Sequence, residues 1–292
     1  MKITFIGLGI MGTEMATHLA NNQKEHDFEL TVYNRSKEAT EKLAKQGTKV
    51  ADSVNEAVSE ADIVFSMLAN PEAVENVFFG ENGGLSAMKK DTIWLDCSTV
   101  NPSFSKRAFE EAKKQGVKFI DAPVAGSKPQ AQNKELVFFI GAEKGSIKDI
   151  EPYLLMMGQK ILSLGDVGKG SSFKMIVNIM LAQSMLMFSE SILLGESMGL
   201  DRDFLLNTLP NLAVTAPFTK FKAPKIKEND YEVQFPLELM HKDLHLATLT
   251  AYEQNQPLFL ANLTKELFAS AKKEGLGRLD FSAIHQFLEK SK

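Results

Sequence analysis

The sequence predicts an α/β protein with two domains, a doubly wound parallel sheet followed by an all-helical half. Short apolar strands alternate with amphipathic helices up to about residue 164, a glycine-rich turn follows the first strand, and one long apolar helix occupies residues 171–198. Alternating strands and helices are typical of a parallel sheet covered on both faces. A length of 292 residues suits two domains, which we place at residues 1–164 and 165–292.

Strands are expected at residues 2–6, 29–33, 62–66, 92–96, 118–121, 136–141 and 160–164. Helical patterns follow the glycine turn and recur at residues 37–46 and 103–115. Each of these two helices ends at a glycine, Gly47 or Gly116, the residue that most often terminates a helix. This order predicts the doubly wound sheet.

The composition is that of a soluble globular protein, with 44% hydrophobic and 24% charged residues and a net charge of −4. The positive residues are spread along the chain, without the basic blocks that bind nucleic acid or acidic lipid. We therefore expect a small soluble molecule as the partner, with no nucleic acid and no membrane.

Cys97 is the one cysteine and excludes an internal disulfide, which fits a reducing compartment. It lies in an apolar strand, so we interpret it as a buried structural thiol. His241 and His245 are four residues apart, but no neighbouring Glu or Cys completes a zinc set, and no metal is expected. No signal peptide pattern is visible, and the protein is expected to be cytoplasmic.

The first strand runs into a dinucleotide-binding fingerprint of the Rossmann type, composed of Gly7, Leu8, Gly9, Ile10, Met11 and Gly12. The first glycine permits the tight turn, the second lets the backbone approach a pyrophosphate, and the third lets helix and strand pack closely. The phosphates are expected at the positive end of the following helix. A purely structural glycine turn is the alternative.

The end of the second strand predicts the choice of cofactor. A carboxylate there would select NAD, but the residues are Asn34, Arg35 and Ser36. Asn34 can bond a ribose hydroxyl, Arg35 can bind a 2′-phosphate with its planar fork of donors, and Ser36 can add a hydrogen bond. The sequence therefore predicts NADP (NADPH) over NAD; the alternative is that Arg35 is an ordinary surface charge.

A second group of polar residues marks the start of the long helix. Lys174 and Asn178 are four residues apart and project from one face of its first turns. On an apolar helix the pKa of the lysine is expected to fall, which suits a general acid that protonates the oxygen of a carbonyl during reduction. An ion-paired structural lysine explains the residues equally well.

A third group follows the strand that ends at Asp121. The segment Pro123–Pro129 is expected to be a loop at the carboxyl edge of the sheet, where ligands bind in open α/β folds. The backbone N–H groups of Gly126 and Ser127, with the Ser127 hydroxyl, could hold a substrate carboxylate. An ordinary loop is the alternative.

The long helix would measure about 40 Å at 1.5 Å per residue. Polar residues interrupt it too often for a membrane span, so we predict a core helix that includes a subunit interface. Further helical segments are expected at residues 202–208, 216–222, 237–254, 257–274 and 280–290.

Taken together, these motifs resemble the β-hydroxyacid dehydrogenase family. The resemblance covers Gly7–Gly12, Asn34-Arg35, Ser98-Thr99, Asp121–Ser127, Gly168–Asn178 and Lys242–Ala247. It implies that Lys174 is the catalytic lysine, that Asn178 helps to place the substrate, and that Thr99 and Lys242 contact the cofactor near the nicotinamide. It also implies that Met67, Leu68 and Ala69 line the ribose, and that the long helix joins the domains in a homodimer or homotetramer.

One position departs from the family pattern. Relatives usually carry serine where this chain has Ala125, and that hydroxyl helps to bind the substrate carboxylate, so Gly126 and Ser127 would have to bind more of it. The segment Gly126–Pro129 with Leu136 resembles the glyoxylate/succinic semialdehyde reductase branch. The resemblance therefore implies an NADPH-dependent reductase of a small aldehyde acid. An NAD-dependent 3-hydroxyisobutyrate-type dehydrogenase and a non-catalytic NADP-binding module remain the alternatives.

Overall fold

The computed structural model describes residues 1–290, and the last two residues of the predicted helical domain lie outside this range. The chain divides into two compact units, Met1–Lys174 and Met175–Lys292, whereas the sequence placed the boundary after residue 164. The difference reflects the long helix, whose first turns pack within the first unit.

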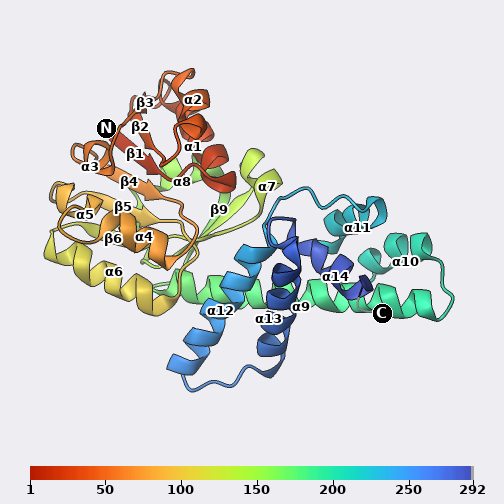
Figure 1. Ribbon diagram of the computed structural model, residues 1–292. Coiled ribbons are helices and arrows are strands. Elements are labelled where there is room, and N and C mark those ends of the chain that lie inside the picture. Colours follow the sequence, from red (N-terminus) through yellow and green to blue (C-terminus); the bar gives the residue numbers. More distant parts are fainter. Residues whose placement is uncertain (291–292) are drawn as a thin grey trace. The chain divides into compact units, whose positions relative to one another are not determined.

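Within the described residues, six parallel strands form the main sheet of the first unit, in the order β3-β2-β1-β4-β5-β6 (Figure 1). This is the strand order of a Rossmann domain. Five of these strands lie within one residue of the predicted ranges, and the two-residue strand β3 was missed. The strands are β1 (Lys2–Ile6), β2 (Glu29–Tyr33), β3 (Lys49–Val50), β4 (Ile63–Ser66), β5 (Ile93–Asp96) and β6 (Lys118–Asp121).

The two faces of this sheet bury separate apolar cores because successive strand residues point to opposite sides. Phe5 and Phe65 face a core that includes α1 (Ile10–Asn22) and α8 (Glu151–Met157). Val64 and Trp94 face a core that includes α4 (Pro71–Phe78) and α6 (Pro102–Lys114). Helices therefore cover both faces, as the alternation of strands and helices predicted. The helices of this unit are α1 (Ile10–Asn22), α2 (Glu38–Ala44), α3 (Val54–Val58), α4 (Pro71–Phe78), α5 (Gly84–Ala87), α6 (Pro102–Lys114), α7 (Lys128–Gln132) and α8 (Glu151–Met157).

A second sheet follows the first, built in the described part of the chain from β7 (Val124–Ala125), β8 (Leu136–Ile140) and β9 (Gly158–Ser163). β7 pairs antiparallel with β8, and β9 pairs parallel with it. The prediction of a plain loop after Asp121 was therefore wrong in part, because this segment contains β7 and the start of α7. A strand of two residues such as β7 is too short to show a hydrophobic period in the sequence.

The long helix α9 spans Lys169–Ser197, two residues earlier at its start than predicted (green in Figure 1). By length and by a mean hydropathy of 1.5 it is the one helix among the described residues that could cross a membrane, and 44% of that window is buried. A core helix of a soluble protein passes the same test of length and hydropathy, so this finding by itself is weak evidence for a span.

The rest of the second unit is helical, with a core that gathers Leu186, Ile192, Met240, Phe268 and Phe281 among others. α11 begins and ends later than the predicted range 216–222 and contains Pro224. The elements are α10 (Arg202–Thr208), η2 (Leu209–Asn211), α11 (Thr219–Glu228), α12 (Leu237–Glu253), α13 (Phe259–Ala271), η3 (Lys272–Leu276), η4 (Phe281–Ala283) and α14 (Ile284–Lys290).

Candidate active site

The three glycines of the first turn meet different surroundings. Gly7 has a φ of +94°, and a Cβ there would collide with the carbonyl oxygen of Met67; a Cβ on Gly12 would collide with the carbonyl oxygen of Gly7. A Cβ on Gly9 would meet nothing within 4 Å. Gly7 and Gly12 therefore let β1, α1 and the loop after β4 pack closely, whereas Gly9 borders open space.

That open space lies at the N-terminus of α1, where Gly9 is the N-cap and no side chain caps the helix. The first N–H groups of a helix have no helical acceptor, and the helix dipole attracts negative charge. Ile10 and Met11 are half-buried at this end. The turn is thus a cradle that fits a pyrophosphate group.

Asn34 has a structural role that the sequence did not reveal. Its Oδ1 accepts a hydrogen bond from the N–H of Leu8 at 2.9 Å, and its Nδ2 donates to the carbonyl and hydroxyl oxygens of Ser36, both at 3.0 Å. Asn34 therefore ties the end of β2 to the glycine turn. Arg35 is exposed and forms no hydrogen bond or ion pair with any of residues 1–290, which leaves its guanidinium available to a ligand.

The loops after β4 and β5 are joined at the carboxyl edge of the sheet. The N–H of Leu68 donates to the Ser98 hydroxyl at 2.9 Å, and the N–H of Ser98 donates to Asp96 Oδ1 at 3.1 Å. The predicted cofactor residues Met67, Leu68 and Ala69 therefore lie beside the segment that carries Thr99. Met67 and Thr99 are half-buried and Ala69 is exposed.

Asp96 is a buried carboxyl group that sequence reasoning did not single out. Its Oδ1 also accepts from the Ser66 hydroxyl at 2.8 Å, while Oδ2 has no partner among residues 1–290. Burial raises the pKa of Asp96 to about 6, and the nearby Asp121 adds to the rise. A polar residue that ends a buried strand was the signal that could have identified it.

The segment expected to bind a substrate carboxylate is ordered by its own side chains. Gly126 has a φ of +118°, and a Cβ there would press against Leu136 and Gln130. The N–H and the hydroxyl of Ser127 both donate to Gln130 Oε1 at 2.9 Å. Ser127 therefore presents two donors to one acceptor atom, and Ala125 contributes no polar atom of its own side chain.

Lys174 and Asn178 lie one turn apart on α9, as predicted, and both are buried, with exposures of 8% and 1%. Asn178 Nδ2 donates to Asp243 Oδ2 at 2.5 Å, and the ammonium of Lys242 lies 2.7 Å from Asp243 Oδ1. Asp243 thus joins two of the predicted residues. Sequence reasoning missed it, although its place beside Lys242 on an apolar helix was a signal.

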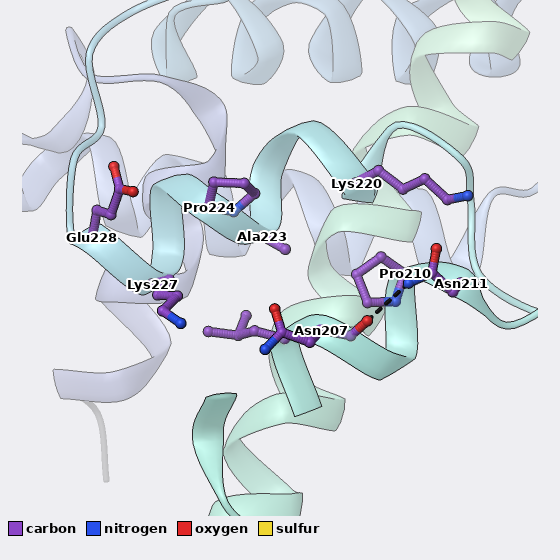
Figure 2. A pocket seen from close by; sticks show the side chains of 9 residues that line it. Asn207, Pro210, Asn211, Lys220, Ala223, Pro224, Lys227 and Glu228 are labelled. Carbon is purple, nitrogen blue, oxygen red and sulfur yellow. Dashed lines mark hydrogen bonds between the residues drawn. The ribbon is translucent and has the colours of Figure 1, made fainter. Parts of the chain in front are cut away.

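Two cavities have linings that include none of these residues. One, of about 260 Å³, is lined by α10, η2 and α11 (Figure 2). Its lining includes Asn207, Lys220 and Lys227, and Lys227 is already paired with Asp203 at 2.9 Å. The other, of about 440 Å³, lies among α4, α5 and α6 and is lined by Glu75, Phe79 and Arg107, among others. Neither cavity includes a predicted site residue.

Cys97 is fully buried, as predicted, and burial raises the pKa of its thiol. Within the described part of the chain, no group of three or more His, Cys, Asp or Glu side chains is placed to hold a metal ion.

The sheet order and the open glycine cradle at its carboxyl edge define the class as dinucleotide-binding proteins of the Rossmann type. Family models agree over most of the chain. Residues 2–165 match the NAD binding domain of 6-phosphogluconate dehydrogenase, and residues 168–288 match the model described as NAD-binding of NADP-dependent 3-hydroxyisobutyrate dehydrogenase.

Similar proteins cover the whole chain. Glyoxylate/succinic semialdehyde reductase 2, chloroplastic, of Arabidopsis thaliana is 34% identical over 100% of this chain and 80% of its own length. Glyoxylate/succinic semialdehyde reductase 1 of the same plant is 33% identical over 97% of each chain. The structure of 3-hydroxyisobutyrate dehydrogenase of Mycobacterium tuberculosis with L-serine has a TM-score of 0.86 at 27% identity, over 98% of each chain. The protein belongs to the β-hydroxyacid dehydrogenase family.

Proposed function

We propose that this protein reduces a small aldehyde acid, such as glyoxylate or succinic semialdehyde, to the hydroxyacid with NADPH. The observation that carries the proposal is that the same unit contains both an open glycine cradle and a buried lysine, Lys174, at the start of α9. The plant relatives that align over nearly the whole chain are named for these two substrates, which supports the same substrate class here.

Each group of residues has one task in this proposal. The turn Gly7–Gly12 would hold the pyrophosphate, Arg35 the 2′-phosphate, and residues 67–69 with Thr99 the nicotinamide ribose. A bound nicotinamide would supply the hydride. Lys174 gives a proton to the carbonyl oxygen of the substrate. Gly126 and Ser127 orient the substrate carboxylate by hydrogen bonds, for which the two Ser127 donors turn from Gln130 Oε1 to the ligand.

In this proposal, the contacts of Asp243 with Asn178 and Lys242 orient these two side chains and do not transfer protons. The Asp243 carboxylate accepts from Asn178 Nδ2, which directs Asn178 Oδ1 away from Asp243. That oxygen is buried and has no hydrogen-bond partner among the described residues. We assign to it the role of accepting a hydrogen bond from the substrate.

The first test is an assay of NADPH oxidation with a panel of aldehyde acids and a matched NADH control. NADPH-dependent turnover of glyoxylate or succinic semialdehyde is the expected result. Oxidation of 3-hydroxyisobutyrate with NAD, without reduction of aldehyde acids, would favour the dehydrogenase alternative. NADPH binding without turnover of any member would favour a binding module.

Lys174→Ala is expected to lower kcat by about 10²–10⁴-fold, the usual contribution of a positioned general acid. The Michaelis constant for NADPH should change little, because the lysine is assigned to the substrate oxygen. Steady-state kinetics of the purified variant measure both values. Lys169→Ala, at the exposed first residue of the same helix, is the matched control. Undiminished turnover in Lys174→Ala would remove the lysine from the mechanism.

We also propose that α9 forms an interface between two copies of the chain. Ile176, Met180, Met187 and Leu194 are 51–64% exposed and are spaced four and seven residues apart, which places them on one face of the helix. An apolar stripe of this length is typical of a surface that another chain covers. This stripe supports a homodimer or homotetramer, and we further propose that the protein is cytoplasmic.

A further inference from the structure

The first turn of α9 is held by a side chain from a distant part of the sequence. The residue before the helix is Gly168, which has no side chain to act as a cap. Asp121, the last residue of β6, supplies the missing acceptors: Oδ1 accepts from the N–H of Gly168 and Oδ2 from the N–H of Ser171, both at 2.8 Å. A carboxylate at the N-terminus of a helix also interacts favourably with its dipole.

Close packing leaves this carboxylate little freedom. Asp121 is 1% exposed, and a Cβ on Gly141 would collide with its carboxylate. A Cβ on Gly170 would collide with the carbonyl oxygen of Phe139 and lie 3.0 Å from Asp121 Oδ2. Side chains larger than hydrogen at either glycine would therefore displace the helix from the carboxylate.

Two lateral contacts fix the same turn. The hydroxyls of Ser105 and Ser171 are 2.7 Å apart, and the rings of Phe139 and Phe173 pack edge to face with centroids 4.8 Å apart. Lys174 follows Phe173 directly and lies three residues after Ser171. The position of its backbone therefore depends on the anchored turn.

We propose that Asp121 is the positioning residue of Lys174. This inference rests on the proposed function of Lys174 as the proton donor. Both oxygens of Asp121 accept from backbone N–H groups, a task that a carboxamide performs with one oxygen only. In Asp121→Asn the amide nitrogen would face one of the two N–H groups, and the first turn would shift. A displacement of about 1 Å can cost about 10²-fold in rate.

The test is a double-mutant cycle between Asp121→Asn and Lys174→Ala. In the wild-type background we expect Asp121→Asn to lower kcat by about 10–100-fold, while the Michaelis constant for NADPH changes by less than about 2-fold. In the Lys174→Ala background the same change should lower kcat by less than about 2-fold, because its effect passes through the lysine.

Asp62→Asn is the matched control. Asp62 also accepts from a backbone N–H, that of Lys2 at 2.8 Å, but it lies at the opposite, amino end of the same sheet. Its kcat should equal that of the wild type. Ser105→Ala serves as a milder second variant, which removes the lateral contact to Ser171 and should lower kcat about 2–5-fold, again without effect in the Lys174→Ala background.

Hydrogen exchange gives a readout that does not need activity. The amides of Gly168 and Ser171 should exchange faster in Asp121→Asn than in the wild type, whereas Asp62→Asn should leave them unchanged. Equal losses of kcat in both backgrounds, full activity of Asp121→Asn, or unchanged exchange of the two amides would each overturn the inference. A wild-type protein without turnover would instead refute the proposed function, and the exchange data would still decide the anchoring.

Discussion

Gly9 and Gly12 lie three residues apart in the glycine-rich turn, but their surroundings in the structure differ. A Cβ on Gly9 would meet no protein atom within 4 Å, and its φ of −76° is open to any residue, whereas a Cβ on Gly12 would collide with the backbone of Gly7. The structure therefore separates a glycine that leaves space at the N-terminus of α1 from a glycine that close packing requires, the two roles that the motif predicts for these positions.

This distinction yields a paired prediction. Gly9→Ala should fold with a melting temperature close to that of the wild type but bind NADPH at least about 10-fold more weakly, since the new methyl group fills the pyrophosphate position. Gly12→Ala should lose about 1–3 kcal/mol of stability through overpacking. Thermal unfolding and NADPH titration measure the two effects. Unchanged NADPH affinity in Gly9→Ala would contradict the cradle.

Arg35 is the second residue whose substitution is informative. Its guanidinium is exposed and unpaired within the described chain, so Arg35→Ala should leave the fold intact. We expect the Michaelis constant for NADPH to rise by about 10-fold or more, because a charge-assisted bidentate contact with the 2′-phosphate is lost, and that for NADH to change little. Lys37→Ala, two residues away and paired with Asp52, is the control. Equal effects on both cofactors would refute the assignment.

At the scale of elements, the carboxyl ends of β4, β5 and β6 form a connected polar edge. Asp96 and Asp121 lie opposite each other on β5 and β6. Asp96 accepts a hydrogen bond from the N–H of Ser98, just after β5, and Asp121 accepts one from the N–H of Ser171, at the start of α9. Two buried carboxyl groups thus order the two segments to which we assign the cofactor ribose and the proton donor. Their burial costs free energy, which the N–H and hydroxyl donors offset in part.

The pKa of Asp96 leads to a prediction about stability. Burial raises the pKa of Asp96 from 3.8 to about 6 in the folded protein. The folded state therefore binds this proton more tightly than the unfolded state does, and protonation of Asp96 stabilises the fold. This stability is fully present below about pH 3.8 and is lost as the pH rises through about 6. A rise of about two units corresponds to about 3 kcal/mol.

Denaturant unfolding of the wild type and Asp96→Asn at pH 4.5 and pH 7.5 tests this. The asparagine does not ionise, so the stability of the wild type relative to the variant should fall by a few kcal/mol, at most about 3, from the lower to the higher pH. The cost of the altered hydrogen bonds is present at both pH values and cancels. A stability difference that does not change with pH would show that Asp96 is not the group that titrates.

At the scale of the whole molecule, the exposed stripe on α9 predicts association. Met180→Glu should place a charge in the proposed interface and convert the proposed dimer or tetramer to smaller species in light scattering, because burying an unpaired charge costs several kcal/mol. Val214→Glu is the matched control, since Val214 is exposed to 83% but lies in the loop before α11. A wild-type protein that is monomeric at micromolar concentration would refute the interface.

Much of the fold could be predicted because its elements are long or strongly patterned. The strands that bury alternate residues on two faces, and the long helix, appear at nearly the expected positions. Some of the shortest elements, such as β3, β7 and α5, were missed because their conformation depends on neighbouring elements rather than on a local hydrophobic period. The site residues of the glycine turn and of α9 carry recognisable motifs, whereas Asp96, Asp121 and Asp243 act through contacts with residues 30 to 65 positions away.

The sequence by itself determined the class of fold, the family and the side chains available for chemistry, since these follow from the order of apolar periods, glycines and polar groups along the chain. The tertiary structure alone decided which of these groups meet. It directs the Asn34 carboxamide to Leu8 and Ser36 and leaves Arg35 open. It also places Asp121 against the first turn of α9. The physical reason is that buried polar groups must find partners, and those partners are set by packing in three dimensions rather than by proximity in sequence.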